Sequence, residues 1–277
     1  MTYRIGIMGT GDARTGGSIP PATITELAGE GFQPELIEPR LNTFPMTPYD
    51  RGLTVLANID CAIEAEKMGF DAVFINAFGD YGIDEMRSAT EMLVIGAGEA
   101  TMAMCTNVGR KFSIVTIWPP KMNFIYHERL RNCGMDDRCV SIINVLTDTE
   151  VVGIEGAGAT IVRLKAGEKN LVDGIIQAIE TAVHSDSADA IALGCTCMAP
   201  IGPEIAKRAS VPVLESMRTG YKTVETMLSL GIRHGHKAFP KASAANIGAL
   251  DALIAGQGNI SLGGNCEVCV TAKEDAK

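Results

Sequence analysis

Two similar segments of the chain end at residues whose side chains could do chemistry. Residues 71–77 read DAVFINA and residues 189–195 read DAIALGC, so Ala77 in the first copy corresponds to Cys195 in the second. Each copy is an apolar run typical of a buried parallel strand, and a loop of small residues follows it. In open α/β sheets, ligands lie beyond the carboxyl ends of the strands. Two equivalent halves facing each other would therefore bring a thiol and a methyl group to one shared cleft.

Cys195 is the candidate catalytic residue. A free thiol has a pKa of about 8.5, and nearby amide donors or a helix N-terminus can lower it enough to supply a thiolate base at neutral pH. A buried, inert cysteine is the usual state of this residue type, but Cys195 lies at a strand-to-loop boundary in a repeat-matched position. We therefore expect Cys195 to be reactive, and we expect Cys197, two residues on, to turn away from the cleft.

Predicted strands and helices alternate along the chain, as in α/β proteins. The repeated strands follow predicted helices at 51–68 and 171–183. The other predicted elements are strands at 3–8, 32–38, 91–96, 111–117, 140–144 and 211–215, helices at 219–230 and 244–255, and helix starts at 22–27 and 126–130. The predicted fold class is α/β with two pseudo-symmetric lobes, each a parallel-sheet α/β sandwich, and with the active site at the lobe interface. Residues 1–108 with 218–277 are expected to form the first lobe, and residues 109–217 the second.

Composition excludes several classes of protein. The 277 residues carry a net charge of −9 with no block of basic residues, so the sequence lacks the charge pattern of a nucleic-acid binder. The N-terminus lacks the apolar stretch of a signal peptide, and no window reaches about 18 uninterrupted apolar residues. We therefore expect a cytoplasmic protein without a membrane partner. The eight cysteines are irregularly spaced, which favours free thiols over a disulfide framework.

Residues 193–198, LGCTCM, resemble the motif that carries the second catalytic cysteine of the aspartate/glutamate/hydantoin racemase superfamily. Residues 76–82, NAFGDYG, are similar to the first-half motif of its hydantoin and allantoin racemase branch, and residues 96–100, GAGEA, resemble the motif that follows. FSIVT at 112–116 and PVLE at 212–215 are similar to further strands of that branch. Together these segments cover most of residues 70 to 230.

The resemblance implies a cofactor-independent enzyme of two pseudo-symmetric α/β halves. Two cysteines on opposite faces of the substrate would move a proton off and onto an acidic carbon. This sequence departs from the pattern at Ala77, which replaces the first cysteine. It also departs at residues 8–11, MGTG, which include Thr10, a candidate substrate-binding residue, but lack the asparagine-rich substrate loop usual in that branch.

The missing thiol leaves three functions open. In a racemase or isomerase, Asp80 or His127 could supply the first base, although we favour a solvated loop or helix face for each. Cys195 alone would suit a decarboxylase that protonates from one face, as the resemblance to the arylmalonate decarboxylase of the same superfamily implies. A non-catalytic ligand-binding protein is the third alternative.

The expected substrate is a small carboxylate or a cyclic imide such as a hydantoin. Backbone N–H groups and hydroxyls, rather than a metal, would hold its anionic groups. The candidate substrate-binding residues, besides Thr10, follow the repeated strands or flank Cys195: Asn76, Ala77, Phe78, Gly79, Thr116 and Thr196. A helix N-cap or a turn is the alternative role for each threonine. We expect no cofactor, no metal and no nucleic acid, and we expect a homo-oligomer.

Two further patterns could indicate ligands. Gly9, Gly11 and Gly16 loosely resemble a dinucleotide fingerprint, but the spacing to the third glycine is wrong. The pair at 266 and 269, CxxC, with His234 and His236 upstream offers the ligand types of a structural zinc site. For the first pattern we favour a glycine-rich loop that covers a carboxylate-binding site. For Cys266 and Cys269 we favour an exposed pair of thiols. The other cysteines, Cys61, Cys105, Cys133 and Cys139, are assigned to packing.

Overall fold

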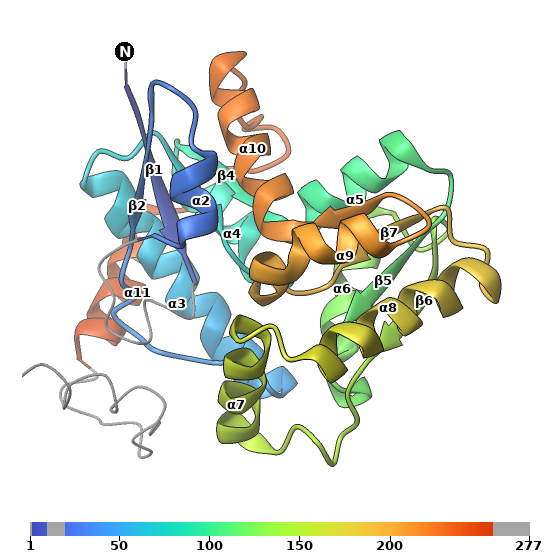
Figure 1. The fold of residues 1–277 in the computed structure, drawn as a ribbon. Helices are drawn as coiled ribbons and strands as arrows, with labels where there is room; N and C mark the ends of the chain where they lie inside the picture. Colours follow the sequence, from blue (N-terminus) through green and yellow to red (C-terminus); the bar gives the residue numbers. More distant parts are fainter. Residues whose placement is uncertain (1, 10–19, 257–277) are drawn as a thin grey trace, which may run out of the picture. The chain divides into compact units, whose positions relative to one another are not determined.

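The computed structural model describes residues 2–9 and 20–256. Over these residues the chain forms two four-stranded sheets with helices between the strands, the α/β class that the sequence predicts (Figure 1). The first sheet consists of β1 (Tyr3–Met8), β2 (Phe32–Leu36), β3 (Ala72–Ile75) and β4 (Leu93–Gly96), and the second of β5 (Phe112–Thr116), β6 (Cys139–Asn144), β7 (Ala190–Leu193) and β8 (Val213–Glu215). The helices are α2 (Ala22–Leu27), α3 (Pro48–Lys67), α4 (Ile83–Ala89), α5 (Ala97–Val108), α6 (Phe124–Cys133), α7 (Gly153–Lys165), α8 (Lys169–His184), α9 (Gly202–Arg208), α10 (Ser216–Ser229) and α11 (Ala244–Ala255).

The two sheets have the same strand order, which confirms the internal repeat. The orders are β2-β1-β3-β4 and β6-β5-β7-β8, so the repeated strands β3 and β7 occupy equivalent positions beside β1 and β5. The pairings of β1 with β3 and of β5 with β7 are both parallel. Ala77 and Cys195 each lie two residues beyond the end of the equivalent strand. The alignment of these two positions is therefore structural as well as sequential.

The aspartate that opens each repeat has the same role in both copies. The Asp71 carboxylate accepts a hydrogen bond from the Arg4 amide at 2.8 Å, at the start of β1. The Asp189 carboxylate accepts hydrogen bonds from the Arg110 and Lys111 amides at 3.0 and 2.9 Å, immediately before β5. These hydrogen bonds give partners to backbone amides at the strand starts, so each aspartate helps to fix the start of the neighbouring strand.

The chain divides into two compact units. Unit 1 comprises residues 1–76, 81–95 and 222–277, and unit 2 comprises residues 77–80 and 96–221. The predicted first lobe extended to residue 108, but α5 and the short segment 77–80 group with unit 2. The reason is packing, since Phe78 on the segment and Met102 and Cys105 on α5 belong to one buried cluster with Phe112 of β5.

Helices cover both faces of the sheet in unit 2. Helices α8 and α9 contact each other, as do α5 and α6. Right-handed crossovers between parallel strands place α8 and α9 on one face of the sheet and α6 on the other (Figure 1). The four β7 residues, Ala190 to Leu193, are fully buried, as expected for a strand covered on both faces.

In unit 1, α3 illustrates how local sequence sets an element. Its N-cap Thr47 accepts a hydrogen bond from the Asp50 amide at 3.2 Å, and Pro48 occupies the first helical position. Gly69, with φ of +79°, ends the helix before β3. The sequence predicts this helix over 51–68, so the capping residues extend it by one turn at its start.

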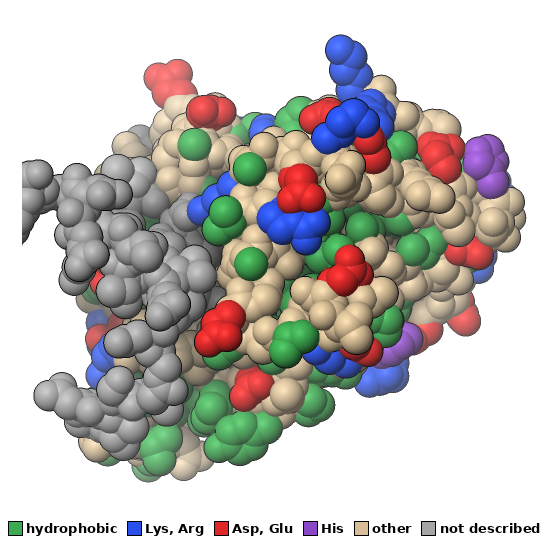
Figure 2. Space-filling view, turned by 60° about the horizontal axis from the view of Figure 1, so that its bottom comes forward, with side chains coloured by type: hydrophobic (Ala, Val, Ile, Leu, Met, Phe, Trp, Pro, Cys, Tyr) green, Lys and Arg blue, Asp and Glu red, His purple; other side chains and the backbone are tan. Residues whose placement is uncertain are grey.

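The described surface mixes both signs of charge. On the face in Figure 2, lysine and arginine side chains are interspersed with aspartate and glutamate. Within residues 2–9 and 20–256, no helix is both long enough and apolar enough to cross a lipid bilayer.

Candidate functional site

Cys195 lies where the repeat predicts it, just beyond the carboxyl end of β7. It is half-buried and forms the N-cap of a short 3-10 helix, η2 (Thr196–Ile201). Its sulfur accepts a hydrogen bond from the backbone amide of Cys197 at 3.2 Å. An amide donor of this kind stabilises negative charge on sulfur, which is the property required of a thiolate base.

The expectation that Cys197 turns away is wrong. The structure joins Cys195 to Cys197 in a disulfide, with one residue between them and the Cα atoms 5.2 Å apart. Cys195 has an extended backbone and Cys197 lies in the first turn of η2, so the chain folds back and brings the two side chains together. Among residues 2–9 and 20–256, the free thiols are Cys61, Cys105, Cys133 and Cys139.

A buried hydrogen-bond chain supports the residue before Cys195. The Tyr126 hydroxyl on α6 donates to the Gly194 carbonyl at 2.9 Å. That hydroxyl also bonds the Thr116 hydroxyl, which in turn accepts from the Trp118 amide at 3.2 Å. Thr116, predicted to bind substrate, is fully buried, and the structure places its hydroxyl in this internal chain.

Phe78 connects the segment 77–80 to the same chain. Its ring packs edge-on against the Tyr126 ring, with the centroids 5.6 Å apart. Ala77 is half-buried, whereas Phe78 and Gly79 are buried. Tyr126 thus contacts both the segment that contains Ala77 and the strand end that precedes Cys195, and both lie in unit 2.

Asp80 anchors the start of α5. Its two carboxylate oxygens accept hydrogen bonds from the Gly98 and Glu99 amides at 2.8 and 2.7 Å, and the Arg129 guanidinium lies 4.0 Å away. Burial raises the pKa of Asp80 to about 7, against the opposing effects of Arg129 and the two amides. These contacts satisfy amides that a helix start otherwise leaves without partners. The structure therefore gives Asp80 a structural position, rather than that of a solvent-exposed base.

The close approach of Asp80 and Phe78 to α5 explains the two glycines of GAGEA. A Cβ at Gly98 would lie 2.0 Å from the Phe78 carbonyl oxygen, and one at Gly96 would lie 2.3 Å from the Asp80 carboxyl group. Neither distance is physically possible without displacement of the segment. The motif is thus a packing requirement between α5 and residues 77–80.

Glu215, at the end of β8, is a second buried carboxyl group. It accepts hydrogen bonds from the Met217 and Arg218 amides at 2.7 and 2.9 Å and so caps α10. Burial raises the pKa of Glu215 to about 7, while the two amides and Arg218 act to lower it. Gly202 at the start of α9 packs directly against this side chain.

The other predicted site residues are dispersed. Thr196 is buried beside Cys195, and Asn76 is buried at the end of unit 1's repeated strand. His127 lies on the exposed side of α6, next to the buried Tyr126. Thr10 falls outside the described residues, as do Gly11 and Gly16 of the glycine pattern.

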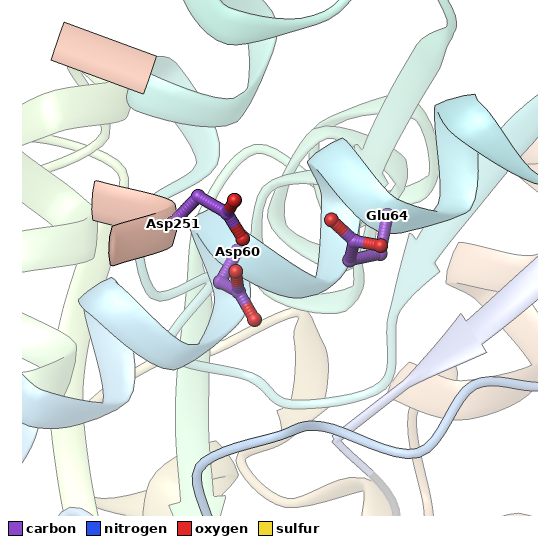
Figure 3. A group of neighbouring side chains, drawn as sticks. All are labelled: Asp60, Glu64 and Asp251. Carbon is purple, nitrogen blue, oxygen red and sulfur yellow. The ribbon is translucent and has the colours of Figure 1, made fainter. Parts of the chain in front are cut away.

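A group of three carboxylates in unit 1 has the spacing of metal ligands, but it already forms ion pairs with an arginine side chain. Asp60 and Glu64 lie one turn apart on α3, with Asp251 of α11 beside them (Figure 3). The Arg40 guanidinium bonds the Asp60 carboxylate and donates to Asp251 at 2.7 Å. This hydrogen bond lowers the pKa of Asp251. We therefore interpret the group as an ion-pair network.

The histidines of the possible zinc pattern are engaged elsewhere. His234 Nε2 accepts a hydrogen bond from the Val94 amide at 2.8 Å, and burial lowers the pKa of His234 to about 4. His236 lies 3.1 Å from the Glu91 carboxylate. Cys266 and Cys269 fall outside the described residues.

Known proteins match this architecture and these motifs. Residues 29–224 match the family model described as Asp/Glu/Hydantoin racemase, over the span that contains both repeated strands. The chain belongs to the Asp/Glu/hydantoin racemase family. It is 27% identical over 183 residues to the hydantoin racemase of Pseudomonas sp. (strain NS671), covering 66% of this chain and 68% of that one. It is 29% identical over 184 residues to the hydantoin racemase of Paenarthrobacter aurescens, covering 66% and 72%.

Solved structures share the family fold. The allantoin racemase from Klebsiella pneumoniae has a TM-score of 0.69 at 25% identity, covering 88% of this chain and 96% of that one. Two lobes, each built on a four-stranded parallel sheet, are thus the architecture of this racemase family member, as the motif resemblance implies.

Sequence reasoning missed Tyr126, Arg129 and the Cys195–Cys197 pairing. The first two act through contacts distant in sequence, and no local pattern marks them. The CxC spacing at 195–197 was a visible signal, because two thiols so close can meet wherever the chain turns sharply between them.

Proposed function

We propose that this protein is a cofactor-independent racemase or isomerase that moves a proton at the acidic carbon of a small carboxylate or hydantoin-like substrate. Cys195, in its reduced form, is the acid/base. The observation that carries the proposal is the position of its sulfur at the end of β7, half-buried and within hydrogen-bond distance of the Cys197 amide. Membership of the racemase family and similarity to two hydantoin racemases support the reaction type.

The proposed step uses the Cys195 thiolate as a base. The sulfur takes the proton from a carbon next to a carbonyl group, and the electron pair moves onto the carbonyl oxygen. Return of a proton to the carbon restores the substrate or forms its mirror image, depending on the face that receives it. The thiolate must be available for this step. The Cys197 amide, which lies 3.2 Å from the sulfur in the disulfide form, can donate to the anion after reduction.

Decarboxylation is the second candidate, and Ala77 favours it. The position equivalent to Cys195 offers a methyl group, so the first copy supplies no thiol for the opposite face of a substrate. A malonate-type acid that loses carbon dioxide forms an enediolate, which needs a proton from one face only, and the Cys195 thiol could provide it. Solved arylmalonate decarboxylase has the same fold, with a TM-score of 0.54 at 17% identity, covering 83% of this chain and 95% of that one.

Proton NMR in deuterated water distinguishes these functions. The reduced protein and Cys195→Ser are compared on hydantoins, amino acids and substituted malonates. Cysteine-dependent exchange of deuterium at a stereocentre, with loss of optical purity, supports the racemase. Carbon dioxide release with deuterium uptake on one face supports the decarboxylase. Tight binding without turnover, unchanged in Cys195→Ser, would contradict both and indicate a ligand-binding protein.

A further inference from the structure

The sulfur assigned to catalysis is also the sulfur that Cys197 can block. Cys195 and Cys197 are both half-buried and are joined in the structure, with one residue between them. A disulfide sulfur has no proton to give and no negative charge with which to take one. The bonded form of Cys195 is therefore unable to act as the acid/base of the proposed function.

We propose that Cys195 and Cys197 form a reversible thiol switch, in which the disulfide blocks Cys195 and reduction restores it. This inference rests on the proposed role of Cys195, and it adds the regulation of that site. Cys197 is the resolving residue of the switch, while its backbone amide, which any residue at 197 provides, donates to the Cys195 sulfur.

The chemistry balances with a small-molecule disulfide as the oxidant. The Cys195 thiolate attacks one sulfur of that disulfide, forms a mixed disulfide and releases one small thiol. The Cys197 thiolate then attacks the Cys195 sulfur, forms the internal disulfide and releases the second small thiol. Two electrons pass from the two cysteines to the small disulfide, and the two cysteine protons end on the two released thiols. A small dithiol reverses both steps.

The other described cysteines are poor competitors for this reaction. Burial raises the pKa of Cys61 and of Cys105 to about 12, and that of Cys133 and of Cys139 to about 11. Exchange needs a thiolate, and these groups are thiols at neutral pH. Cys195 is half-buried, whereas Cys61 on α3 and Cys105 on α5 are buried, and the Cys195 sulfur has an amide donor. Oxidation among the described residues is therefore expected first at Cys195.

Peptide mapping reads the switch without any substrate. Trypsin cleaves after Lys169 and Lys207, so residues 170–207 form one peptide whose cysteines are Cys195 and Cys197 alone. Cys266 and Cys269 fall in a different peptide, residues 242–273, and do not confuse the result. The full-length protein is treated with oxidised glutathione or with dithiothreitol, alkylated with iodoacetamide, digested and weighed.

Three proteins are compared. In the natural protein, the oxidised 170–207 peptide should lack two hydrogen atoms and carry no alkyl group, and dithiothreitol should restore two alkylated thiols. Cys197→Ser should instead retain glutathione on Cys195, because the resolving thiol is missing. Cys133→Ser, which removes a half-buried thiol outside the pair, should behave like the natural protein.

Activity gives a second readout. Oxidation should lower Cys195-dependent proton exchange by at least ~100-fold, the scale of one acid/base group, and dithiothreitol should restore it. Reduced Cys133→Ser should remain within about threefold of the reduced natural protein, before oxidation and after recovery with dithiothreitol. Two alkylatable thiols in the oxidised natural peptide, or stable glutathione on it, would overturn the switch. If the Cys195–Cys197 disulfide forms and is reduced as expected but the reduced protein turns over no substrate, the redox chemistry of the pair is supported. The proposed function is then contradicted.

Discussion

The hydroxyl of Tyr126 donates a hydrogen bond to the carbonyl oxygen of Gly194, 2.9 Å away, and so holds the residue that precedes Cys195. The same ring packs against Phe78, one residue beyond Ala77. One buried aromatic side chain thus contacts the residues that follow both repeated strands, Phe78 after β3 and Gly194 after β7. Residues that never contact a substrate can in this way determine where Cys195 lies.

Tyr126→Phe should weaken the fold and slow the reaction. The change leaves the buried Gly194 carbonyl without this donor, which costs about 1–3 kcal/mol in the free energy of unfolding. A displaced Cys195 should lower the proton-exchange rate by ~10- to 100-fold. Urea denaturation and NMR exchange measure the two effects. Tyr49→Phe, at a residue with 76% of its surface exposed, is the matched control and should change neither.

Gly98→Ala should be strongly destabilising, because the added Cβ would lie 2.0 Å from a backbone oxygen of Phe78. We expect a loss of about 3 kcal/mol or more in the free energy of unfolding. Gly52→Ala, also in a helix, has no atom within 4 Å of the new Cβ. It should instead stabilise by ~0.5–1 kcal/mol, since alanine is the better helix former. Equal effects of the two changes in urea denaturation would contradict the packing of residues 77–80 on α5.

The contribution of Glu215 to the stability should fall as the pH rises between about 4.5 and 7. Burial raises the pKa of Glu215 from 4.5 to about 7, so the folded protein binds this proton more tightly than the unfolded chain does. The stabilisation is complete below pH 4.5 and is lost as the pH passes through 7, by up to about 3 kcal/mol. Asp80 adds an effect of the same sign. His234, whose pKa burial lowers from 6.5 to about 4, adds an effect of the opposite sign between those pH values.

Glu215→Gln should remove this contribution and leave those of Asp80 and His234. Urea denaturation of both proteins at pH 5 and pH 8 tests the expectation. The exposed Glu204, on α9, provides the control Glu204→Gln, which should keep the pH dependence of the natural protein. A stability that rises from pH 5 to pH 8 by an amount sensitive to Glu215→Gln would reverse the assigned direction.

Ala77→Cys should restore a thiol at the position equivalent to Cys195. If the proposed racemase chemistry is correct, the second thiol should raise the rate of racemisation at least ~10-fold over the natural protein, the low end for an added acid/base group. Ala77→Ser, which adds a side chain of similar size without a comparable base, should give no such gain. Polarimetry on hydantoins follows the reaction. An inert double-thiol protein would show that the family chemistry does not extend to these substrates.

The sequence by itself determined the local elements and the family. Strand β7, the helix Ala244–Ala255 and the end of α3 at Gly69 follow from apolar patterns and capping residues, which act over a few residues at a time. The repeat also placed Ala77 and Cys195 in equivalent positions. Helix α7 was not predicted, because its sequence, GIEGAGATIVRLK, contains three glycines that lower helix propensity and obscure the pattern.

Only the tertiary structure decided how the site residues are used. The Thr116 hydroxyl forms a hydrogen bond with the Tyr126 hydroxyl. The Asp80 carboxylate accepts hydrogen bonds from the amides at the start of α5. Cys197 meets Cys195 because the backbone turns into η2 between them. In each case the role depends on which polar groups burial brings together, and that is a property of packing between distant segments, for which a single sequence carries no local pattern.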